Sequence, residues 1–390
     1  MIVYFATTSV EFNYILPILK KTGGCLITES KSLYNFVTSQ YPFVKCYVDK
    51  MCNLSNYHPD VLILAGNYAW VPKKVKLVQI FHGLTDKRSI YQKRNFKDPH
   101  SLLFLTSCFI ESYLPKWFRK FSLVSDELWK PFKQLELDKL IKNRYDLLCL
   151  VGKHMKEKFK DLNLLTDTNW KLVGFPRLDC VINNELSREE IFKDLKLDPT
   201  LPTILYAPTW RGHQKVNLSS IPYMGLEICK SIDDDMNFIF KPHPCVKQHN
   251  EFPETMRKIE QYIKKHQNFV NPDAFTDIIS LMYISDLLIT DFSTVAIEYL
   301  PLDRPILFAD HLGEKYDDPD LVEIWIRDAG EIVRDTNEIK SMIRGCLDNP
   351  SERSKIRQSY RDCFFYALDG KASERVVNQI EKLVLKRRTP

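Results

Sequence analysis

The chain has 390 residues, of which 44% are apolar, with 55 Lys plus Arg against 50 Asp plus Glu. This composition supplies material for buried cores and excludes both a disordered tail and a single small module. The formal net charge of +5 is much less basic than nucleic-acid-binding domains usually are. We therefore expect no nucleic-acid partner.

The cysteines and the first residues bear on the cellular compartment. Ten cysteines are scattered along the chain, without a CxxC pair or a His/Cys cluster at zinc-finger spacing, which predicts reduced thiols. The first residues lack the basic start and apolar stretch of a secretory signal, so we expect a cytoplasmic protein. The most apolar stretch, residues 102–110, reaches about half of the roughly 20 residues that span a bilayer. Any membrane contact should be peripheral.

In the first half of the chain, short apolar, β-branched runs alternate with longer amphipathic segments. This alternation is typical of parallel strands joined by crossover helices, and it predicts an α/β fold. We expect a Rossmann-like domain here. The predicted strands are residues 2–6, 44–48, 61–65, 77–81, 102–106 and 147–151, and the predicted helices include residues 11–21 and 153–162.

The second half repeats the pattern after a polar stretch that ends in the breaker cluster of residues 198–202. A second Rossmann-like domain should follow and face the first across a cleft. An amphipathic helix, residues 373–388, should then pack back across the domains. We place the domains at residues 1–190 and 191–370, with the final helix in residues 371–390. The predicted strands are residues 203–207, 237–241, 287–290 and 306–309, with a helix at 254–266.

Several common site motifs are missing from the sequence. The chain has no GxGxxG after its first strand and no GxxxxGK[ST], HExxH or GxSxG motif, which removes the main support for dinucleotide dehydrogenases and P-loop proteins. The acidic runs at residues 233–235 and 317–320 lie in turns without histidine partners. We therefore expect no essential metal and no other cofactor.

One predicted strand runs directly into His82 and Gly83. Ligands of open α/β sheets bind at the carboxyl ends of strands, so His82 is a candidate base beside a glycine that permits close backbone approach. The alternative is a loop histidine followed by a turn glycine. Basic residues with interleaved aromatics follow, among them Lys87 and Arg88, and they suit an anionic lipid headgroup or a pyrophosphate-bearing acceptor. A merely solvated basic face is equally consistent with this pattern.

Two further candidates follow strands of the second domain. His243 stands between Pro242 and Pro244, which restrict the backbone and so constrain the direction of the imidazole. Such preorganisation suits phosphate binding, whereas the alternative is a rigid turn with a satisfied histidine. Arg211 comes just after the strand at 203–207 and is a permanently charged, forked donor for phosphate oxygens. A surface salt bridge is the alternative.

The segment from Thr290 to Glu298 leads from a strand into a predicted helix at residues 295–300. The hydroxyls of Ser293 and Thr294 and the free backbone N–H groups at a helix start suit a pyrophosphate. Glu298 follows Thr294 by four residues, hence on roughly the same helix face, where its carboxylate can accept both ribose hydroxyls of a nucleotide. The alternative is an ordinary helix cap with a solvated glutamate.

Together and in this order, these motifs resemble the CDP-glycerol glycerophosphotransferase family. The resemblance rests on five motifs, namely His-Gly at 82–83, Gly-x-Pro-Arg-x-Asp at 174–179, Tyr-Ala-Pro-Thr-Trp-Arg at 206–211, Pro-His-Pro at 242–244 and Thr-Asp-Phe-Ser-Thr at 290–294. It implies the GT-B fold, with two facing Rossmann-like domains. It also implies a peripheral enzyme at the inner face of the cell membrane that builds teichoic-acid-like or capsular polymers from CDP-activated polyols.

The resemblance also implies roles for individual residues. His82 takes the place of the general base that removes a proton from an acceptor hydroxyl, which then attacks the β-phosphorus of CDP-glycerol or a related CDP-polyol and releases CMP. His243 is the second catalytic residue. The donor side comprises Thr209, Arg211, Asp291, Ser293, Thr294 and the ribose-binding Glu298, and the acceptor side comprises Gly83, Lys87 and Arg88.

The sequence leaves the acceptor and the donor tail open. Residues 84–87 read Leu-Thr-Asp-Lys, where the family commonly has Thr-Pro-Leu-Lys. Three other functions fit two Rossmann-like domains: a GT-B glycosyltransferase that uses a nucleotide sugar, a nucleotide-sugar 2-epimerase, and a nucleotide-regulated binding protein without catalysis.

Overall fold

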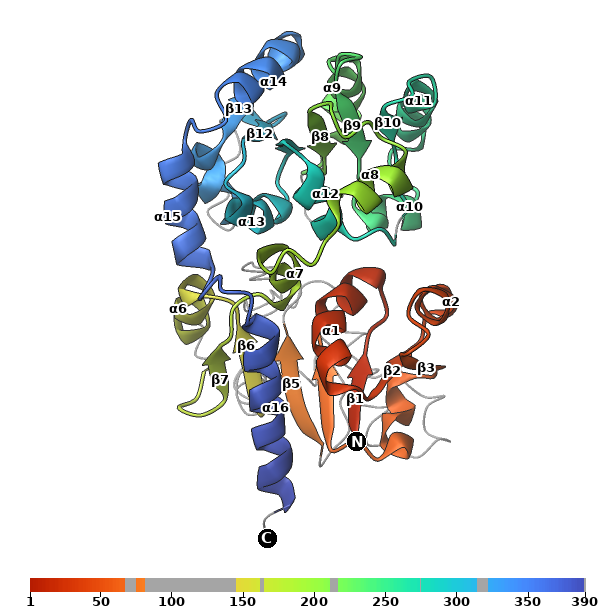
Figure 1. Ribbon diagram of the computed structural model, residues 1–390, viewed down its shortest axis with the longest axis vertical. Coiled ribbons are helices and arrows are strands. Elements are labelled where there is room, and N and C mark those ends of the chain that lie inside the picture. Colours follow the sequence, from red (N-terminus) through yellow and green to blue (C-terminus); the bar gives the residue numbers. More distant parts are fainter. Residues whose placement is uncertain are drawn as a thin grey trace, which may run out of the picture. The chain divides into compact units, whose positions relative to one another are not determined.

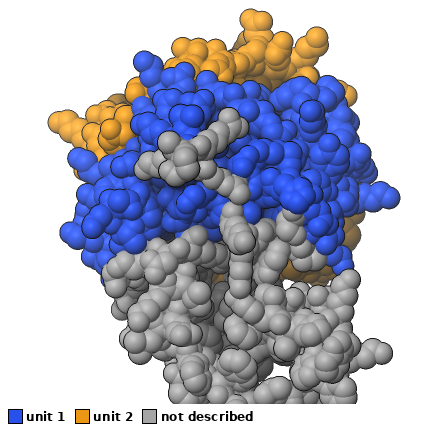
Figure 2. Space-filling model, turned by 90° about the horizontal axis from the view of Figure 1, so that it is seen from below, with its two compact units in different colours: residues 1–82, 86–177, 371–390 blue, residues 83–85, 178–370 orange. Residues whose placement is uncertain are grey.

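The computed structural model describes residues 1–66, 75–80, 145–161, 165–210, 217–273, 275–313 and 322–388. These residues form two compact units, shown in different colours in Figure 2. Unit 1 comprises the described residues up to Arg177 together with 371–388, and unit 2 comprises those from Leu178 to Gly370. The chain therefore returns to its first unit at its C-terminal end.

Unit 1 is built on a sheet of seven parallel strands in the order β3-β2-β1-β4-β5-β6-β7 (Figure 1). Strands β2, β4 and β6 are buried along their whole length, as expected for a parallel sheet covered by helices on both faces. The strands are β1 (Ile2–Phe5), β2 (Cys25–Thr28), β3 (Lys45–Val48), β4 (Val61–Leu64), β5 (Lys76–Ile80), β6 (Leu147–Leu150) and β7 (Trp170–Leu172).

The helices of unit 1 begin at residues that suit helix starts. Helix α1 (Ser9–Thr22) has a complete capping box, in which the Thr8 hydroxyl accepts from the Glu11 N–H and the Glu11 carboxylate accepts from the Thr8 N–H. The other helical segments are α2 (Lys31–Gln40), the 3₁₀ turn η1 (Met51–Tyr57) and α6 (Lys153–Asp161), and the 3₁₀ turn η4 (Pro176–Leu178) leads into unit 2.

The C-terminal helix α16 (Ala372–Arg388) belongs to unit 1, where it packs beside α1 (Figure 1). Val376 and Ile380 on its apolar face are fully buried, and the Arg375 guanidinium donates to the Val173 carbonyl (Nε···O 2.8 Å). The predicted return of this helix across the fold is therefore confirmed.

Unit 2 is built on six parallel strands in the order β10-β9-β8-β11-β12-β13. Because β8 lies between β9 and β11, the carboxyl ends of these three strands lie side by side. The strands are β8 (Thr203–Tyr206), β9 (Asn237–Phe240), β10 (Phe269–Val270), β11 (Leu287–Thr290), β12 (Ile306–Ala309) and β13 (Glu331–Val333).

Helices surround this second sheet and complete a core rich in Ile, Phe and Met. The α-helices of unit 2 are α7 (Asp179–Ile182), α8 (Arg188–Leu195), α9 (Leu226–Lys230), α10 (Pro244–Gln248), α11 (Pro253–Ile263), α12 (Ile278–Ile284), α13 (Val295–Tyr299), α14 (Ile339–Asp348) and α15 (Ser354–Phe364). The shorter turns are the π-helical η5 (Ile221–Gly225) and the 3₁₀ turns η6 (Leu300–Leu302), η8 (Val322–Ala329) and η9 (Thr336–Glu338).

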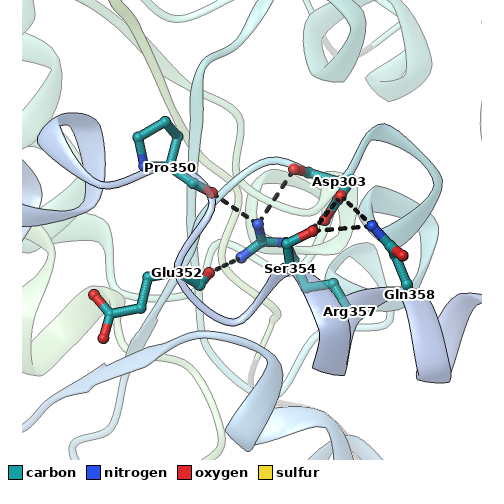
Figure 3. A network of polar contacts seen from close by, with 6 residues as sticks. All are labelled: Asp303, Pro350, Glu352, Ser354, Arg357 and Gln358. Atoms are coloured by element: carbon teal, nitrogen blue, oxygen red, sulfur yellow. Dashed lines mark hydrogen bonds and ion pairs between the residues drawn. The ribbon is translucent and has the colours of Figure 1, made fainter.

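A buried arginine joins α15 to the turn that follows α13 and η6 (Figure 3). Arg357 is only 1% exposed, and its guanidinium donates to the Asp303 carboxylate at 2.9 Å and to the carbonyls of Pro350 and Glu352 at 2.7 and 2.8 Å. The Ser354 hydroxyl donates to the second Asp303 oxygen at 2.6 Å. Asp303 adopts the left-handed backbone conformation (φ 50°), and these contacts hold it there.

The predicted strands and helices that lie on described residues are present in the structure, and their ends lie close to the predicted ones. The predicted strand at 102–106 lies outside the described residues. Strands β2, β7, β10 and β13 were not predicted; β7, β10 and β13 have only two or three residues, too few to show a clear pattern.

The two compact units divide at Arg177, before the predicted domain boundary at 190. Helices α7 and α8 join unit 2, since α8 packs against α12. The assignment of residues 1–190 to the acceptor and 191–370 to the donor stays a prediction. None of the described helices combines the length and apolar composition needed to cross a bilayer.

Candidate functional site

Several predicted site residues follow the adjacent carboxyl ends of β8, β9 and β11 in unit 2. Thr209 follows β8, His243 follows β9, and Asp291 and Ser293 follow β11. Because β8 pairs with both neighbours in parallel, the sheet brings these segments to one edge. This edge is where open α/β sheets bind their ligands.

Asp291 lies beneath this edge and is 1% exposed. Its Oδ1 accepts from the Thr209 N–H at 2.8 Å, and its Oδ2 accepts from the N–H and the hydroxyl of Ser220, both at 2.8 Å. Burial raises the pKa of the Asp291 carboxyl to about 6, although these hydrogen bonds and the charge of Arg327 act in the opposite direction. Both carboxylate oxygens therefore have partners inside the protein.

Further contacts lock the ends of β8 and β11 together. The Thr290 hydroxyl donates to the Ala207 carbonyl at 2.8 Å, and the Tyr206 and Ser220 hydroxyls form a buried hydrogen bond of 2.8 Å. Burial raises the pKa of Tyr206 well above its ordinary value, so its hydroxyl stays neutral at physiological pH. These contacts fix the carboxyl ends of β8 and β11, after which Thr209 and Ser293 follow.

His243 is held in a defined orientation at the start of α10. Its Nδ1 accepts from the Cys245 N–H at 3.2 Å, so in the neutral ring the proton lies on Nε2. The imidazole packs in a near-parallel stack on the Trp210 indole, with ring centroids 6.1 Å apart. The direction of the imidazole is thus restricted by the cap and by the ring contact, in addition to the predicted effect of the two prolines. In this tautomer, Nε2 is the hydrogen-bond donor of the imidazole.

Lys241 was not singled out from the sequence, because it reads as the last residue of a strand. It is 8% exposed, and its ammonium donates to the Asp273 carbonyl. Burial lowers the pKa of Lys241 to about 8, so the side chain is mostly charged at pH 7. It places a partly buried positive charge two residues before His243.

Three predicted donor-side residues lie near the start of α13 or within it. Ser293 and Thr294 directly precede the helix, and Glu298 lies inside it. The Ser293 hydroxyl accepts from the Val295 N–H at 3.4 Å, and Thr294 stands at the N-cap without a capping side-chain bond. Glu298 is only 4% exposed. The alternative of a solvated glutamate is therefore wrong, because this carboxylate is buried against the protein.

Arg327 is a second buried group that the sequence did not reveal. Its guanidinium pairs with Asp310 at 2.8 Å and lies over the Phe292 ring, 4.3 Å from the ring centroid. Its Nε and Nη2 are buried and have no hydrogen-bond partner among the residues that the structure describes. Burial lowers the pKa of Arg327, while Asp310 and Asp291 raise it. No spacing could indicate this residue, since η8 approaches α13 only in the fold.

Five predicted site residues, His82, Gly83, Lys87, Arg88 and Arg211, lie outside the described residues. Described residues lead up to the first of them. Gln79 near the end of β5 is fully buried and donates to the carbonyls of Ala65 and Gly66 at 3.3 and 3.2 Å. The carboxyl ends of β4 and β5 are therefore tied together where the chain approaches His82.

Among the residues that the structure describes, no three His, Cys, Asp or Glu side chains gather as metal ligands. The acidic run at residues 233–235 instead pairs with basic residues of α14. Arg344 contacts Asp233 and Asp235 at 2.7 Å, and Lys340 contacts Asp233 at 2.6 Å. These carboxylates have a structural role on the surface.

A family model described as CDP-Glycerol:Poly(glycerophosphate) glycerophosphotransferase matches residues 124–382, which is well over half of the chain. The chain belongs to this family. The match includes the segments of β8, β9 and β11 with Thr209, His243, Asp291, Ser293, Thr294 and Glu298. The resemblance inferred from the motifs is therefore confirmed.

Curated relatives of this glycerophosphotransferase-family chain act in teichoic acid synthesis. It is 29% identical over 223 residues to a teichoic acid poly(ribitol-phosphate) polymerase of Bacillus spizizenii, covering 53% of this chain and 32% of the relative. It is 24% identical over 242 residues to a teichoic acid glycerol-phosphate primase of Bacillus subtilis, covering 62% and 58%. The matches span less than two thirds of these relatives.

Solved structures confirm the fold. The wall teichoic acid polymerase TagF matches all of this chain and 90% of its own, with a TM-score of 0.68 and 18% identity. A Staphylococcus aureus MnaA structure with UDP matches with a TM-score of 0.57 and 13% identity, covering 100% and 98%. At these identities the likeness shows the fold alone, and the predicted GT-B type is confirmed.

Proposed function

We propose that this protein transfers a polyol phosphate from a CDP-polyol, with glycerol phosphate as the first candidate, to a hydroxyl of a cell-surface glycan, glycolipid or teichoic-acid-like acceptor. The observation that carries this proposal is the family match across the segments after β8, β9 and β11. The fold is shared with a UDP-GlcNAc 2-epimerase from Neisseria meningitidis, whereas the matched family is that of glycerophosphotransferases.

In the proposed reaction, His82 removes the proton from the acceptor hydroxyl as its oxygen attacks the β-phosphorus. A new P–O bond forms to the acceptor, the bond from the β-phosphorus to the bridging oxygen breaks, and CMP leaves with that oxygen. General-base catalysis of this kind contributes about 10²–10⁴-fold to the rate.

His243 acts on the donor side of this reaction. With Nδ1 occupied by the Cys245 N–H, its Nε2–H is the group that can donate to a phosphate oxygen. Arg211, Ser293 and Thr294 would add charge or hydrogen bonds to the pyrophosphate, and Glu298 would accept from the ribose hydroxyls. Preorganised donors of this type supply the largest part of many rate enhancements.

The cellular setting belongs to the same proposal. The acceptor of such a reaction is carried on a lipid or polymer at the inner face of the cell membrane. We propose a cytoplasmic enzyme that contacts this face peripherally through basic, aromatic-bearing stretches such as residues 87–97 and 116–120. The reaction needs no metal and no other cofactor. Nucleic acid is not a partner.

The test is mass-spectrometric detection of nucleotide products after incubation with CDP-glycerol, CDP-ribitol and a panel of nucleotide sugars, with crude glycolipid or polymer as acceptor. We expect CMP from a CDP-polyol and an acceptor heavier by one polyol-phosphate unit. A nucleoside diphosphate released from a sugar donor would indicate a glycosyltransferase, and a retained nucleotide with an inverted sugar would indicate an epimerase. Tight CDP-polyol binding without turnover would favour a binding protein.

A further inference from the structure

Asp291 belongs to the predicted donor-binding motif, but the residues around it indicate a different role. Its carboxylate is buried, and each oxygen already accepts a short hydrogen bond from the protein. We propose that Asp291 is a positioning residue whose ionised carboxylate clamps the segments of Thr209 and Ser220 onto β11 and thereby orders the donor side of the site. The donor-binding part of this inference rests on the proposed function.

The clamp joins three segments that are distant in the sequence. Thr209 and Asp291 are 82 residues apart, and Ser220 and Asp291 are 71 residues apart. The Ser220 hydroxyl extends the network to Tyr206 on β8. A single carboxylate thus fixes the chain on both sides of residues 211–216, which lie outside the described residues.

The clamp reaches His243 through one aromatic side chain. Thr209 directly precedes Trp210, whose indole stacks on His243 at 6.1 Å and on His249 at 5.5 Å between ring centroids. These two histidines cap the two ends of α10. Fixing the Thr209 backbone therefore fixes the ring against which the His243 imidazole rests.

The ionised form of Asp291 matches its partners in the clamp. The ionised carboxylate only accepts hydrogen bonds, which matches the two N–H groups and the hydroxyl that face it. A protonated Asp291 would present an O–H to one of these donors. Among the described residues, the other titratable groups that act on Asp291 are Tyr206, which is neutral, and Arg327, which favours the ionised form. With a pKa of about 6, Asp291 is mostly ionised at pH 7, so the form that accepts all three hydrogen bonds is the one present.

The first experiment is native-state hydrogen exchange of the Thr209 and Ser220 amides, which needs no turnover. At pH 7 we expect their protection to be lower in Asp291→Asn than in the wild-type protein, because the nitrogen of the Asn amide donates and cannot accept from them. The Ala207 amide, which donates to the Ile289 carbonyl at 2.9 Å in the same sheet, serves as the reference and should keep its protection. Equal behaviour of all three amides would overturn the inference.

The second experiment is steady-state kinetics of Asp291→Asn, whose amide cannot accept at both positions. We expect the KM for the CDP-polyol to rise about 10- to 100-fold and the kcat at saturation to change less. Ser220→Ala, which loses only the hydroxyl, should raise KM by less. If Asp291→Asn does not fold, the KM of Ser220→Ala and the exchange of its Thr209 amide still decide the matter.

Two outcomes separate this inference from its alternatives. If Asp291→Asn lowers donor affinity while the Thr209 and Ser220 amides stay fully protected, Asp291 contacts the donor directly and the clamp is wrong. If the wild-type protein turns over no CDP-polyol, the proposed function fails, whereas the exchange data still test the clamp by themselves.

Discussion

The indole of Trp210 and the imidazole of His243 lie nearly parallel, with planes inclined by 22° and centroids 6.1 Å apart. The two rings follow neighbouring strands, β8 and β9, so the contact depends on the pairing of these strands. Together with the bond from the Cys245 N–H, the stack restricts both the tilt and the rotation of the imidazole. The ring is thus oriented before any donor arrives.

We expect Trp210→Ala to lower kcat/KM for the CDP-polyol by about 3- to 10-fold, because an aromatic pair contributes about 0.5–1.5 kcal/mol beyond its buried area. Trp210→Phe keeps a ring and should lose less. CMP release at limiting donor measures the effect. His249→Ala is the matched control, since it removes the other ring that Trp210 contacts. Unchanged kinetics for Trp210→Ala would show that the stack does not orient His243.

Two substitutions of His243 should separate its cap from its chemistry. Asn places its amide oxygen near the position of Nδ1, where it can accept from the Cys245 N–H but cannot donate from the position of Nε2. We expect His243→Asn to fold normally and to lose about 10²–10³-fold in kcat, as measured by CMP release. His243→Gln, which reaches further, should keep more activity. A wild-type rate for His243→Asn would rule out a catalytic role for Nε2.

Asp291 should make a pH-dependent contribution to stability. Its folded pKa of about 6 lies above the ordinary value of 3.8, so the folded state binds the proton more tightly than the unfolded state. The contribution is fully present below about pH 4 and is lost as the pH rises through 6. The expected loss is about 3 kcal/mol of unfolding free energy.

Urea denaturation of wild type and Asp291→Asn at several pH values measures this contribution. The stability of wild type relative to the variant should fall as the pH rises from 4 to 7. Asp286→Asn, at the other end of β11, is the control, because its carboxylate also accepts from a backbone N–H, that of Thr203 at 2.9 Å. A difference that does not vary with pH would contradict a raised pKa at Asp291.

Arg357→Ala should destabilise unit 2 strongly. The substitution removes a fully buried cation and leaves the Asp303 carboxylate without its closest charged partner. Breaking a buried ion pair in this way costs about 3–5 kcal/mol. Arg361→Ala on the same helix is the control, because its pair with Asp362 is more exposed and should contribute less than about 1 kcal/mol. Similar denaturation midpoints for both variants would show that the network in Figure 3 stabilises little.

Much of the fold and part of the candidate site followed from local sequence signals. The strands at residues 203–207, 237–241 and 287–290 were predictable, because a strand that is buried on both faces is a continuous apolar run. Because such strands end at polar residues, their sequence also located the segments of Thr209, His243 and Ser293. Strands as short as β10 and β13 have no recognisable apolar run in the sequence, since their positions depend on neighbouring strands of the sheet.

The sequence by itself determined the family, the α/β class and which polar residues follow the carboxyl ends of strands in the second sheet. Only the tertiary structure decided what the polar residues there contact. Asp291 reads as a ligand in its motif, yet strand pairing buries it between Thr209 and Ser220. Arg327 reaches Phe292 through the packing of η8. The physical reason is that the local pattern of apolar residues determines which side chains of an element are buried. Contacts between distant segments depend instead on strand order and helix packing.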